Sequence, residues 1–114
     1  MDIKIDIRPK SNNITLVVLR GEIGAETVNQ FKDKIDAIIN EGRKRLILDF
    51  QEVTYLNPIG LGVIAATLKK VKKDKGNLKL INLTPSVQEL FEMTRLTKVF
   101  EIFDSEESAI KSFN

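Results

Sequence analysis

Isoleucines alternate with charged residues at the start of the chain. Ile3, Ile5 and Ile7 are each followed by a charged residue. This period of two predicts a strand with one face in water, as at the edge of a sheet. A turn-forming cluster occupies residues 9–13, and the apolar residues 14–19 predict a second strand. The two strands should therefore form an antiparallel hairpin.

Apolar residues recur at helical spacing in two longer segments. The first segment is suited to end at Gly42 as its C′ residue. The second is expected from about residue 58 to residue 75, with Gly76 ending it. The apolar stripe of the first helix is Val28, Phe31, Ile35, Ile38 and Ile39, and that of the second is Leu61, Ile64, Ala65, Leu68 and Val71.

Two shorter helices are expected towards the C-terminus. Thr84 followed by Pro85 is suited to start a helix, as an N-cap residue and the first helical residue. Residues 104–107 are acidic or serine, and acids in a first turn are favoured by the helix dipole. The residues expected to face the core are Val87, Leu90, Phe91 and Thr94 in the third helix and Ala109, Ile110 and Phe113 in the last.

Short apolar runs between the helices predict buried strands. Residues 46–50 are apolar except for Asp49, as in a parallel strand covered on both faces. Residues 78–83 form a similar run, and residues 99–103 would add an edge strand. Strands that alternate with helices imply right-handed crossovers. The sequence predicts one α/β domain over residues 1–114, with a four- or five-stranded mixed sheet, an N-terminal antiparallel hairpin and about four helices.

The chain from Leu46 to Gly62 is the most informative stretch, because a buried strand is followed there by a helix start. Asn57 can accept a backbone hydrogen bond as an N-cap, and Pro58 is suited to the first helical position. Gly60 and Gly62 follow in the first turn, although each glycine weakens a helix by roughly 1 kcal/mol relative to alanine. We expect them to leave bare backbone that another molecule or a neighbouring loop can approach. This helix start is the predicted functional site.

One alternative for the helix start is a dinucleotide-binding loop. Residues 60–65, GLGVIA, fit the pattern G-x-G-x-x-A. That fingerprint requires the strand to run directly into the first glycine, whereas nine residues separate Phe50 from Gly60. It also requires an acidic residue at the end of the next strand, where this chain has residues 79–82, KLIN. A nucleotide-dependent enzyme is therefore disfavoured.

The composition argues against catalysis. With no cysteine and no histidine, the chain lacks a thiolate nucleophile, the commonest general base and the commonest metal ligands. The carboxylates Asp49, Glu52, Glu22 and Glu26 could form an acid/base pair, but no clear nucleophile accompanies them. We expect no enzyme activity, no metal site and no cofactor.

Charge and hydropathy limit the classes of partner. The net charge of +2 is too small to indicate nucleic acid or a membrane by itself. The lysine-rich residues 69–75 have no aromatic neighbours to stack bases, and we interpret them as the solvated end of a helix. No apolar run approaches the roughly 20 residues of a membrane span, and the N-terminus lacks a signal peptide's apolar core. The chain is expected to be cytoplasmic, with no nucleic-acid partner and no membrane insertion.

Several segments, taken in order, resemble the STAS domain, the fold of bacterial anti-sigma factor antagonists. The segment LILDFQEVTYLNPIGLGVIAATLKKVKK is similar to the centre of that domain, where a buried strand ending in Asp leads to Asp-Ser-Ser-Gly-Leu-Gly at a helix start. Gly21-Glu22-Ile23 is similar to the family's Gly-Glu-Leu turn, and residues 96–109 are similar to its C-terminal signature. The resemblance covers the whole chain and implies a single STAS-like domain.

The resemblance implies partner switching as the function. In the family, the unmodified antagonist binds an anti-sigma factor, often also a serine kinase, and thereby releases a sigma factor for transcription. The kinase phosphorylates the first Ser of the Asp-Ser-Ser-Gly motif, which breaks the complex, and a phosphatase resets it. A phosphate adds about −1.5 to −2 charges at the centre of the contact, so the interactions around it fail together.

This chain departs from the family pattern at the helix start. Residues 57–60, NPIG, replace Asp-Ser-Ser-Gly, so Pro58 stands at the phosphoacceptor position and has no hydroxyl. Ile59 makes the helix start apolar, which favours a contact surface. Either the partner is bound without a switch, or the switch has moved. Thr54 and Tyr55 carry the nearest hydroxyls, and Thr54 is a weak substitute because both residue types are common where a strand ends.

The leading hypothesis is a non-enzymatic binding module, an anti-sigma factor antagonist-like regulator. Its protein partner would be an anti-sigma factor or a serine kinase of the switch type. The expected contact residues lie at the helix start and in the turn after the second strand: Asn57, Pro58, Ile59, Gly60, Leu61, Gly24 and Ala25. The alternative is a STAS scaffold or accessory subunit of another assembly, such as a stress-signalling complex or a transporter. A nucleotide-dependent enzyme is the remote alternative.

Overall fold

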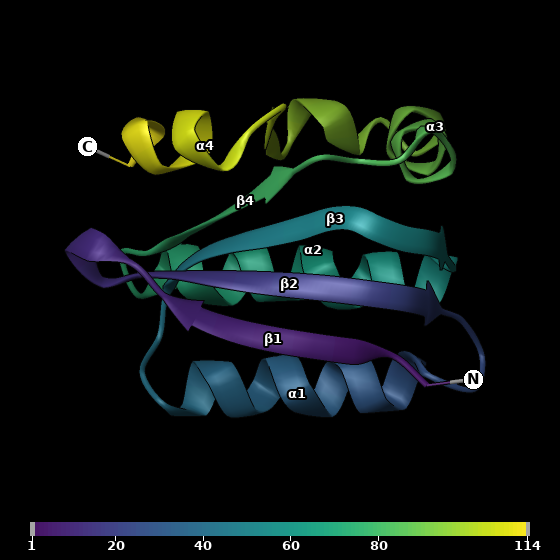
Figure 1. Ribbon diagram of the computed structural model, residues 1–114, viewed down its shortest axis with the longest axis horizontal. Coiled ribbons are helices and arrows are strands. Elements are labelled where there is room, and N and C mark those ends of the chain that lie inside the picture. Colours follow the sequence, from purple (N-terminus) through teal and green to yellow (C-terminus); the bar gives the residue numbers. More distant parts are fainter. Residues whose placement is uncertain (1, 114) are drawn as a thin grey trace.

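A five-stranded mixed sheet runs through the centre of the molecule (Figure 1). The structure is a computed structural model and describes residues 2–113. The strands follow one another across the sheet in chain order: β1 (Lys4–Pro9), β2 (Ile14–Ile23), β3 (Arg45–Leu56), β4 (Asn77–Ile81) and β5 (Glu101–Phe103). β1 pairs with β2 antiparallel, and the other neighbouring strands pair in parallel. The predicted hairpin, mixed sheet and α/β class are confirmed.

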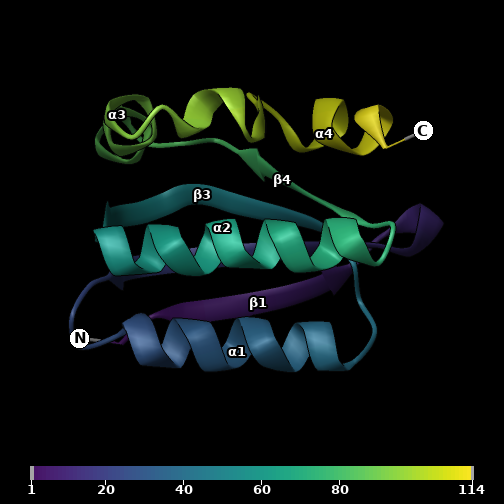
Figure 2. The same ribbon diagram turned by 180° about the vertical axis from the view of Figure 1, so that it is seen from behind.

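Helices cover the two faces of the sheet unequally. The helices are α1 (Val28–Asn40), α2 (Pro58–Lys73), α3 (Pro85–Met93) and α4 (Glu106–Ser112), with 3-10 turns at Ser11–Asn13 and Leu96–Lys98. α1 and α2 lie side by side against one face (Figure 2), and Val87 and Phe91 of α3 join the same core. Phe31 of α1 and Phe50 of β3 are fully buried in it. The main core therefore lies on the face of the sheet that α2 covers.

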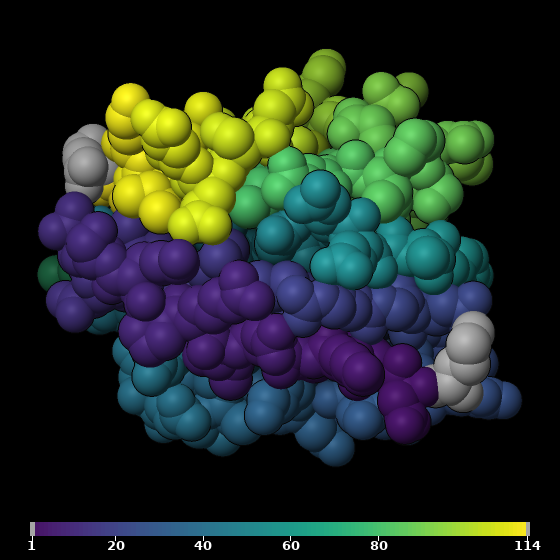
Figure 3. Space-filling model, viewed as in Figure 1, coloured from purple at the N-terminus to yellow at the C-terminus, as the bar shows by residue number. Residues whose placement is uncertain are grey.

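The opposite face of the sheet is only partly covered. α4 packs there through Ala109, Ile110 and Phe113 against apolar residues of the sheet that include Ile47 and Ile81. Figure 3 shows α4 over one part of this face, with side chains of β1, β2 and β3 forming the surface beside it. The predicted docking residues of the last helix are thus confirmed.

β3 is much longer than the sequence predicts. The apolar run 46–50 indicated a strand that ends at Phe50, but β3 continues to Leu56. The pairing of β2 with β3 shifts register twice, between Val18 and Arg20 and between Gly21 and Glu22. Such irregularities break the alternation of inward and outward side chains. The buried residues at this end of β3 are therefore three apart, and a period of two misses them.

Two helix-end predictions need correction. Gly76 was expected to end α2, but Lys75 takes the left-handed conformation, at φ 67°, and α2 ends at Lys73. Thr84 precedes α3 as predicted, but its hydroxyl makes no cap and instead donates to the carbonyl of Val53 at 3.0 Å. Gly42, in contrast, follows α1 with φ 85°, as a C′ glycine should.

Candidate functional site

The extended β3 delivers the chain directly to the start of α2. Leu56, the last residue of β3, pairs with Ile23, the last residue of β2. The next amide, that of Asn57, donates to the carbonyl of Ile23 at 2.8 Å. The entry into α2 is thus fixed to the sheet by backbone hydrogen bonding. Only three residues separate the end of β3 from Gly60, rather than the nine counted from Phe50.

Asn57 caps α2 as predicted. Its side-chain Oδ1 accepts a hydrogen bond from the amide of Gly60 at 2.8 Å, and Pro58 occupies the first turn. The Asn57 side chain is 8% exposed. The cap therefore satisfies a helix N–H inside the protein, and this N–H is not left for an external ligand.

Gly60 and Gly62 have different structural settings. A Cβ on Gly60 would lie 2.7 Å from Cγ2 of Ile23 and 2.8 Å from Cδ1 of Leu56. A Cβ on Gly62 would meet no atom within 4 Å. Gly60 thus allows α2 to pack closely on the ends of β2 and β3. Its backbone is covered by the protein itself and is not bare to another molecule, contrary to the expectation. Gly62 alone lies in open space.

Three predicted contact residues are buried. Leu61 is 4% exposed, and Asn57 and Gly60 are also buried. They position the helix start from inside the fold and do not form its outer surface. Pro58 is exposed, and the Ile59 side chain is 64% exposed. The helix start therefore presents Pro58 and Ile59 to solvent.

The turn between β2 and α1 lies beside this helix start. A Cβ on Gly24 would lie 3.6 Å from Cδ2 and Cε2 of the Tyr55 ring, and Tyr55 is 48% exposed. Ala25 is exposed in the same turn. Gly24, Ala25 and Tyr55, together with Glu22 and two neighbouring residues, line a hollow of about 350 Å³. We call Gly24, Ala25, Tyr55, Pro58 and Ile59 the tip surface.

Thr27 fixes the turn and was missed by the sequence analysis. Its Oγ1 accepts from the amide of Gly24 at 2.9 Å and donates to the carbonyl of Glu22 at 2.6 Å. Thr27 is 4% exposed, so these bonds lie out of water. A threonine three residues after a glycine and directly before a helix is a local signal that could have identified this turn.

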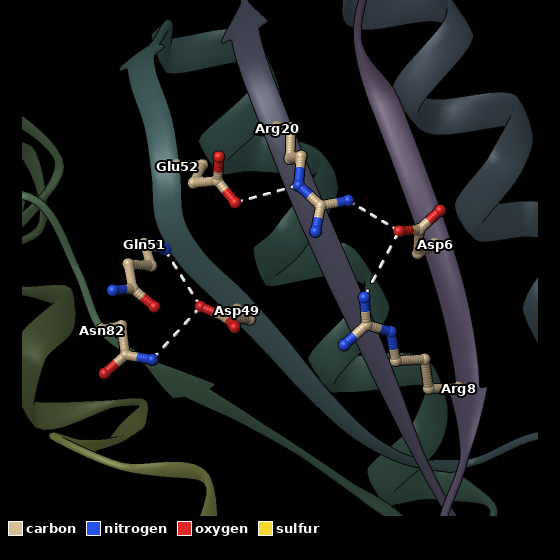
Figure 4. Close-up of polar contacts among 7 residues, drawn as sticks. All are labelled: Asp6, Arg8, Arg20, Asp49, Gln51, Glu52 and Asn82. Carbon is tan, nitrogen blue, oxygen red and sulfur yellow. Dashed lines mark hydrogen bonds and ion pairs between the residues drawn. The ribbon is translucent and has the colours of Figure 1, made fainter.

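The carboxylates considered for acid/base chemistry on β3 have partners within the sheet (Figure 4). Asp49 accepts from the amide of Gln51 at 3.0 Å and from Nδ2 of Asn82 at 3.3 Å. Glu52 accepts from Nε of Arg20 at 2.9 Å. Both carboxylates therefore lie on the face of the sheet that α4 covers only in part, which we call the open face. Within residues 2–113, no group of histidine, cysteine or acidic residues could hold a metal ion.

Arg20 is the centre of the ionic contacts on this face. Its Nη1 donates to Oδ2 of Asp6 at 2.6 Å, and Arg8 lies 3.5 Å from the same oxygen (Figure 4). The hydrogen bond from Arg20 lowers the pKa of Asp6 below its ordinary 3.8, and Asp6 in turn raises the pKa of Arg20. Both side chains are exposed enough that water screens the pair.

The hydroxyl of Thr54 lies near the tip surface but not in it. Thr54 is exposed, and its Oγ1 is 3.4 Å from the carbonyl of Gly21. Ser86, at the start of α3, donates to the carbonyl of Thr54 at 3.5 Å. The end of β3 is thus contacted from both sides.

None of the helices in residues 2–113 combines the length and the apolar character needed to cross a bilayer.

Comparison with known proteins identifies the fold and the family. The family model described as the STAS domain matches residues 7–109. The anti-sigma-B factor antagonist of Bacillus subtilis (strain 168) is 32% identical over 97% of this chain and 100% of its own length. A crystal structure of an anti-sigma factor antagonist from Mycobacterium paratuberculosis has a TM-score of 0.86 at 24% identity, over 96% of this chain and 92% of that one. SpoIIAA in its unphosphorylated form has a TM-score of 0.82 at 22% identity, over 96% of both chains.

These matches define a STAS domain with the fold of the anti-sigma factor antagonists, as the sequence resemblance implied. The chain belongs to the STAS domain family, and its curated relatives in that family are anti-sigma factor antagonists. Those relatives are regulators by name.

Proposed function

We propose that this protein is an anti-sigma factor antagonist that binds its partner through the tip surface. The partner would be an anti-sigma factor or a serine kinase of the switch type, and the protein would act in the cytoplasm without catalysing a reaction. The observation that supports this proposal most strongly is the 64% exposure of Ile59 on a chain of this family. A large aliphatic side chain gains by leaving water when a partner covers it.

The tip surface has the properties of a small binding centre. Complete burial of an isoleucine side chain contributes about 1.5–3 kcal/mol. Tyr55, which is 48% exposed near the end of β3, adds aromatic surface. A few residues of this kind carry most of the energy in a typical interface. The Asn57 cap and the Thr27 hydrogen bonds hold the two segments in place before binding. Little conformational freedom would then be lost when the partner docks.

The same surface has no serine hydroxyl at the position given by the family resemblance. SpoIIAA has been solved in both an unphosphorylated and a phosphorylated form. In this chain Pro58 stands where the resemblance places the acceptor, and the apolar Ile59 follows it. We propose that partner binding at the tip surface is not switched by phosphorylation at residue 58. Thr54 is the substitute phosphoacceptor, so the proposal also requires that Thr54 is not phosphorylated.

Affinity capture from the source cell tests the proposal. The tagged protein is used as bait beside Ile59→Asp, and the intact mass of the recovered protein is recorded. We expect a protein partner on the unchanged bait, its absence on the variant, and no added phosphate mass. A phosphate on Thr54 would contradict the unswitched mode. A native assembly that elutes far above the size of a pair in gel filtration would instead support the scaffold or accessory-subunit alternative.

A further inference from the structure

Positive charge is concentrated at the end of α2, far from the tip surface. Five of the seven residues from Lys69 to Lys75 are lysines. α2 has 16 residues, so its two ends are about 24 Å apart at the usual rise of an α-helix. Figure 2 shows the C-terminal ends of α1 and α2, and the loops that follow them, at the same side of the molecule. A ligand here would not compete with one at the tip surface.

Two loops meet at this end of the molecule and bring further cations to it. The amide of Asn77 donates to the carbonyl of Lys44 at 2.9 Å. A Cβ on Gly76 would lie only 2.0 Å from that carbonyl oxygen, so the glycine is required for the loops to approach. The loop after α1 therefore sits against the turn after α2, and its residues Arg43 and Lys44 join the lysines of α2.

A groove lies between these two loops. It has a volume of about 410 Å³, and four cations line it: Arg43, Lys44, Lys73 and Lys75. Ile39, which is partly exposed, provides aliphatic surface in it, whereas Val71 is buried at 1% exposure. None of its lining residues is aromatic. Asp74 is the only acidic residue among those that line it. We call these four cations, with Ile39, the basic groove.

Folding accounts for only part of this charge, since Arg43 pairs with Glu41 at 3.1 Å but the other cations of the groove have no such partner in the part of the chain that the structure describes. Within residues 2–113, none of Lys44, Lys73 and Lys75 forms an ion pair, whereas Arg20 on the open face pairs with two carboxylates. The helix dipole favours cations only in the last turn of α2. Lys69 and Lys73 are four residues apart, and like charges at that spacing repel each other along a helix. Lys69 and Lys73 thus weaken α2 slightly, and within residues 2–113 neither has an ion-pair partner, whereas Lys70 lies 3.8 Å from Asp36.

We propose that the basic groove binds an acidic peptide segment, one in which aliphatic residues lie between the acids, on a protein partner. Carboxylates of the segment would pair with Lys44, Lys73 and Lys75, and an aliphatic side chain would contact Ile39. A single-stranded nucleic acid is a poorer fit because the groove offers no ring for base stacking. A flat bilayer is a poorer fit because the cations line a hollow and not a plane.

Fluorescence anisotropy with a labelled peptide tests this proposal. The probe is a short synthetic peptide that repeats Glu-Leu-Asp-Glu, titrated with the full chain at low and at physiological ionic strength. The groove variant carries Lys44→Gln, Lys73→Gln and Lys75→Gln. The matched control carries Lys4→Gln, Lys34→Gln and Lys98→Gln, which are exposed lysines outside the groove. Circular dichroism on both variants verifies that each is folded.

The proposal predicts saturable binding that weakens as salt increases, because exposed charges are screened. The groove variant should bind about tenfold more weakly, since three exposed ion pairs are removed together. The control variant and Ile59→Asp should bind like the unchanged protein, so the result does not depend on the tip surface.

Three outcomes would overturn the assignment. The first is no binding of the peptide by the unchanged protein. The second is equal weakening in the groove variant and the control, which would indicate only general charge attraction. The third is tighter binding to a DNA duplex, or to phosphatidylserine vesicles, than to the peptide. If a peptide repeating Glu-Ser-Asp-Glu bound equally well, the proposed aliphatic contact with Ile39 would be wrong.

Discussion

α2 presents an isoleucine to solvent in its first turn and a series of lysines in its last two turns. At its start, Asn57 satisfies a helix N–H from inside the fold, and Ile59 remains exposed. At its end, none of the carboxylates in residues 2–113 pairs with Lys73 or Lys75. One end therefore has unburied apolar surface, and the other has unpaired charge.

Two contacts on one helix can therefore have different physical characters. A contact at the tip surface should depend weakly on salt, because it gains mainly from the removal of apolar surface from water. A contact in the basic groove should weaken steeply as ionic strength increases. Substitutions at each end of α2 test its structural basis.

Gly76→Ala should produce the largest loss of stability, at the groove end. The added Cβ would lie 2.0 Å from the backbone oxygen of Lys44, which cannot move without moving its loop. We expect a decrease of about 3 kcal/mol in the free energy of unfolding, measured by chemical denaturation. Gly42→Ala is the control, because its Cβ would meet no atom within 4 Å and only its φ of 85° is unfavourable. Equal losses in the two variants would show that the contact between the loops is not tight.

Gly60→Ala and Gly62→Ala should change stability in opposite directions, at the tip end. Alanine favours a helix over glycine by about 1 kcal/mol at either position. At Gly60 the clash with Ile23 and Leu56 should exceed this gain, for a net loss of about 1 kcal/mol. At Gly62 the gain should be realised because the site is open. A stabilised Gly60→Ala protein would contradict the close packing of α2 on the sheet.

Asn57→Ala should destabilise the protein by about 1 kcal/mol, because it removes the cap of α2. Asn57→Asp keeps an acceptor oxygen at the same place and is the matched control. Thermal unfolding of the two variants measures the difference. If both lost the same stability, the side chain would contribute through packing and not through its hydrogen bond.

The smallest expected effect concerns Asp6 on the open face of the sheet. Its pKa is lowered by the hydrogen bond from Arg20, so the pair stabilises the fold above the ordinary pKa of 3.8. That contribution is lost as the pH falls through the lowered value. Carboxyl NMR titration should give Asp6 a pKa below 3.8, and Arg20→Gln should return it towards that value. An unchanged Asp6 pKa in Arg20→Gln would contradict the assigned cause.

The order of elements could be predicted from local patterns. The alternation of Ile3, Ile5 and Ile7 indicated an edge strand, and β1 is an edge strand. The helical spacing from Val28 to Ile39 indicated α1 almost to its bounds. Such patterns report which side of an element faces the core, and this depends on period alone.

The details of the candidate site could not be predicted in the same way. The length of β3 depends on its irregular pairing with β2, which joins residues about thirty positions apart in the chain. The requirement for glycine at position 60 depends on side chains of Ile23 and Leu56. A single sequence without the fold does not reveal which distant atoms fill the space at a glycine. For the same reason, it did not show that Asn57 would be buried, whereas helical spacing had already placed Leu61 on the apolar stripe of α2.

Position 59 offers the most direct test of the proposed docking surface. Calorimetric titration of the captured partner would compare the unchanged protein with Ile59→Asp and with Val99→Asp. Val99 is also an exposed aliphatic residue, at 52%, and lies outside the tip surface. If the start of α2 is the contact, Ile59→Asp should bind at least about thirtyfold more weakly, the loss of 2 kcal/mol expected of a central interface residue, while Val99→Asp binds normally. Equal affinity of Ile59→Asp and the unchanged protein would contradict the account.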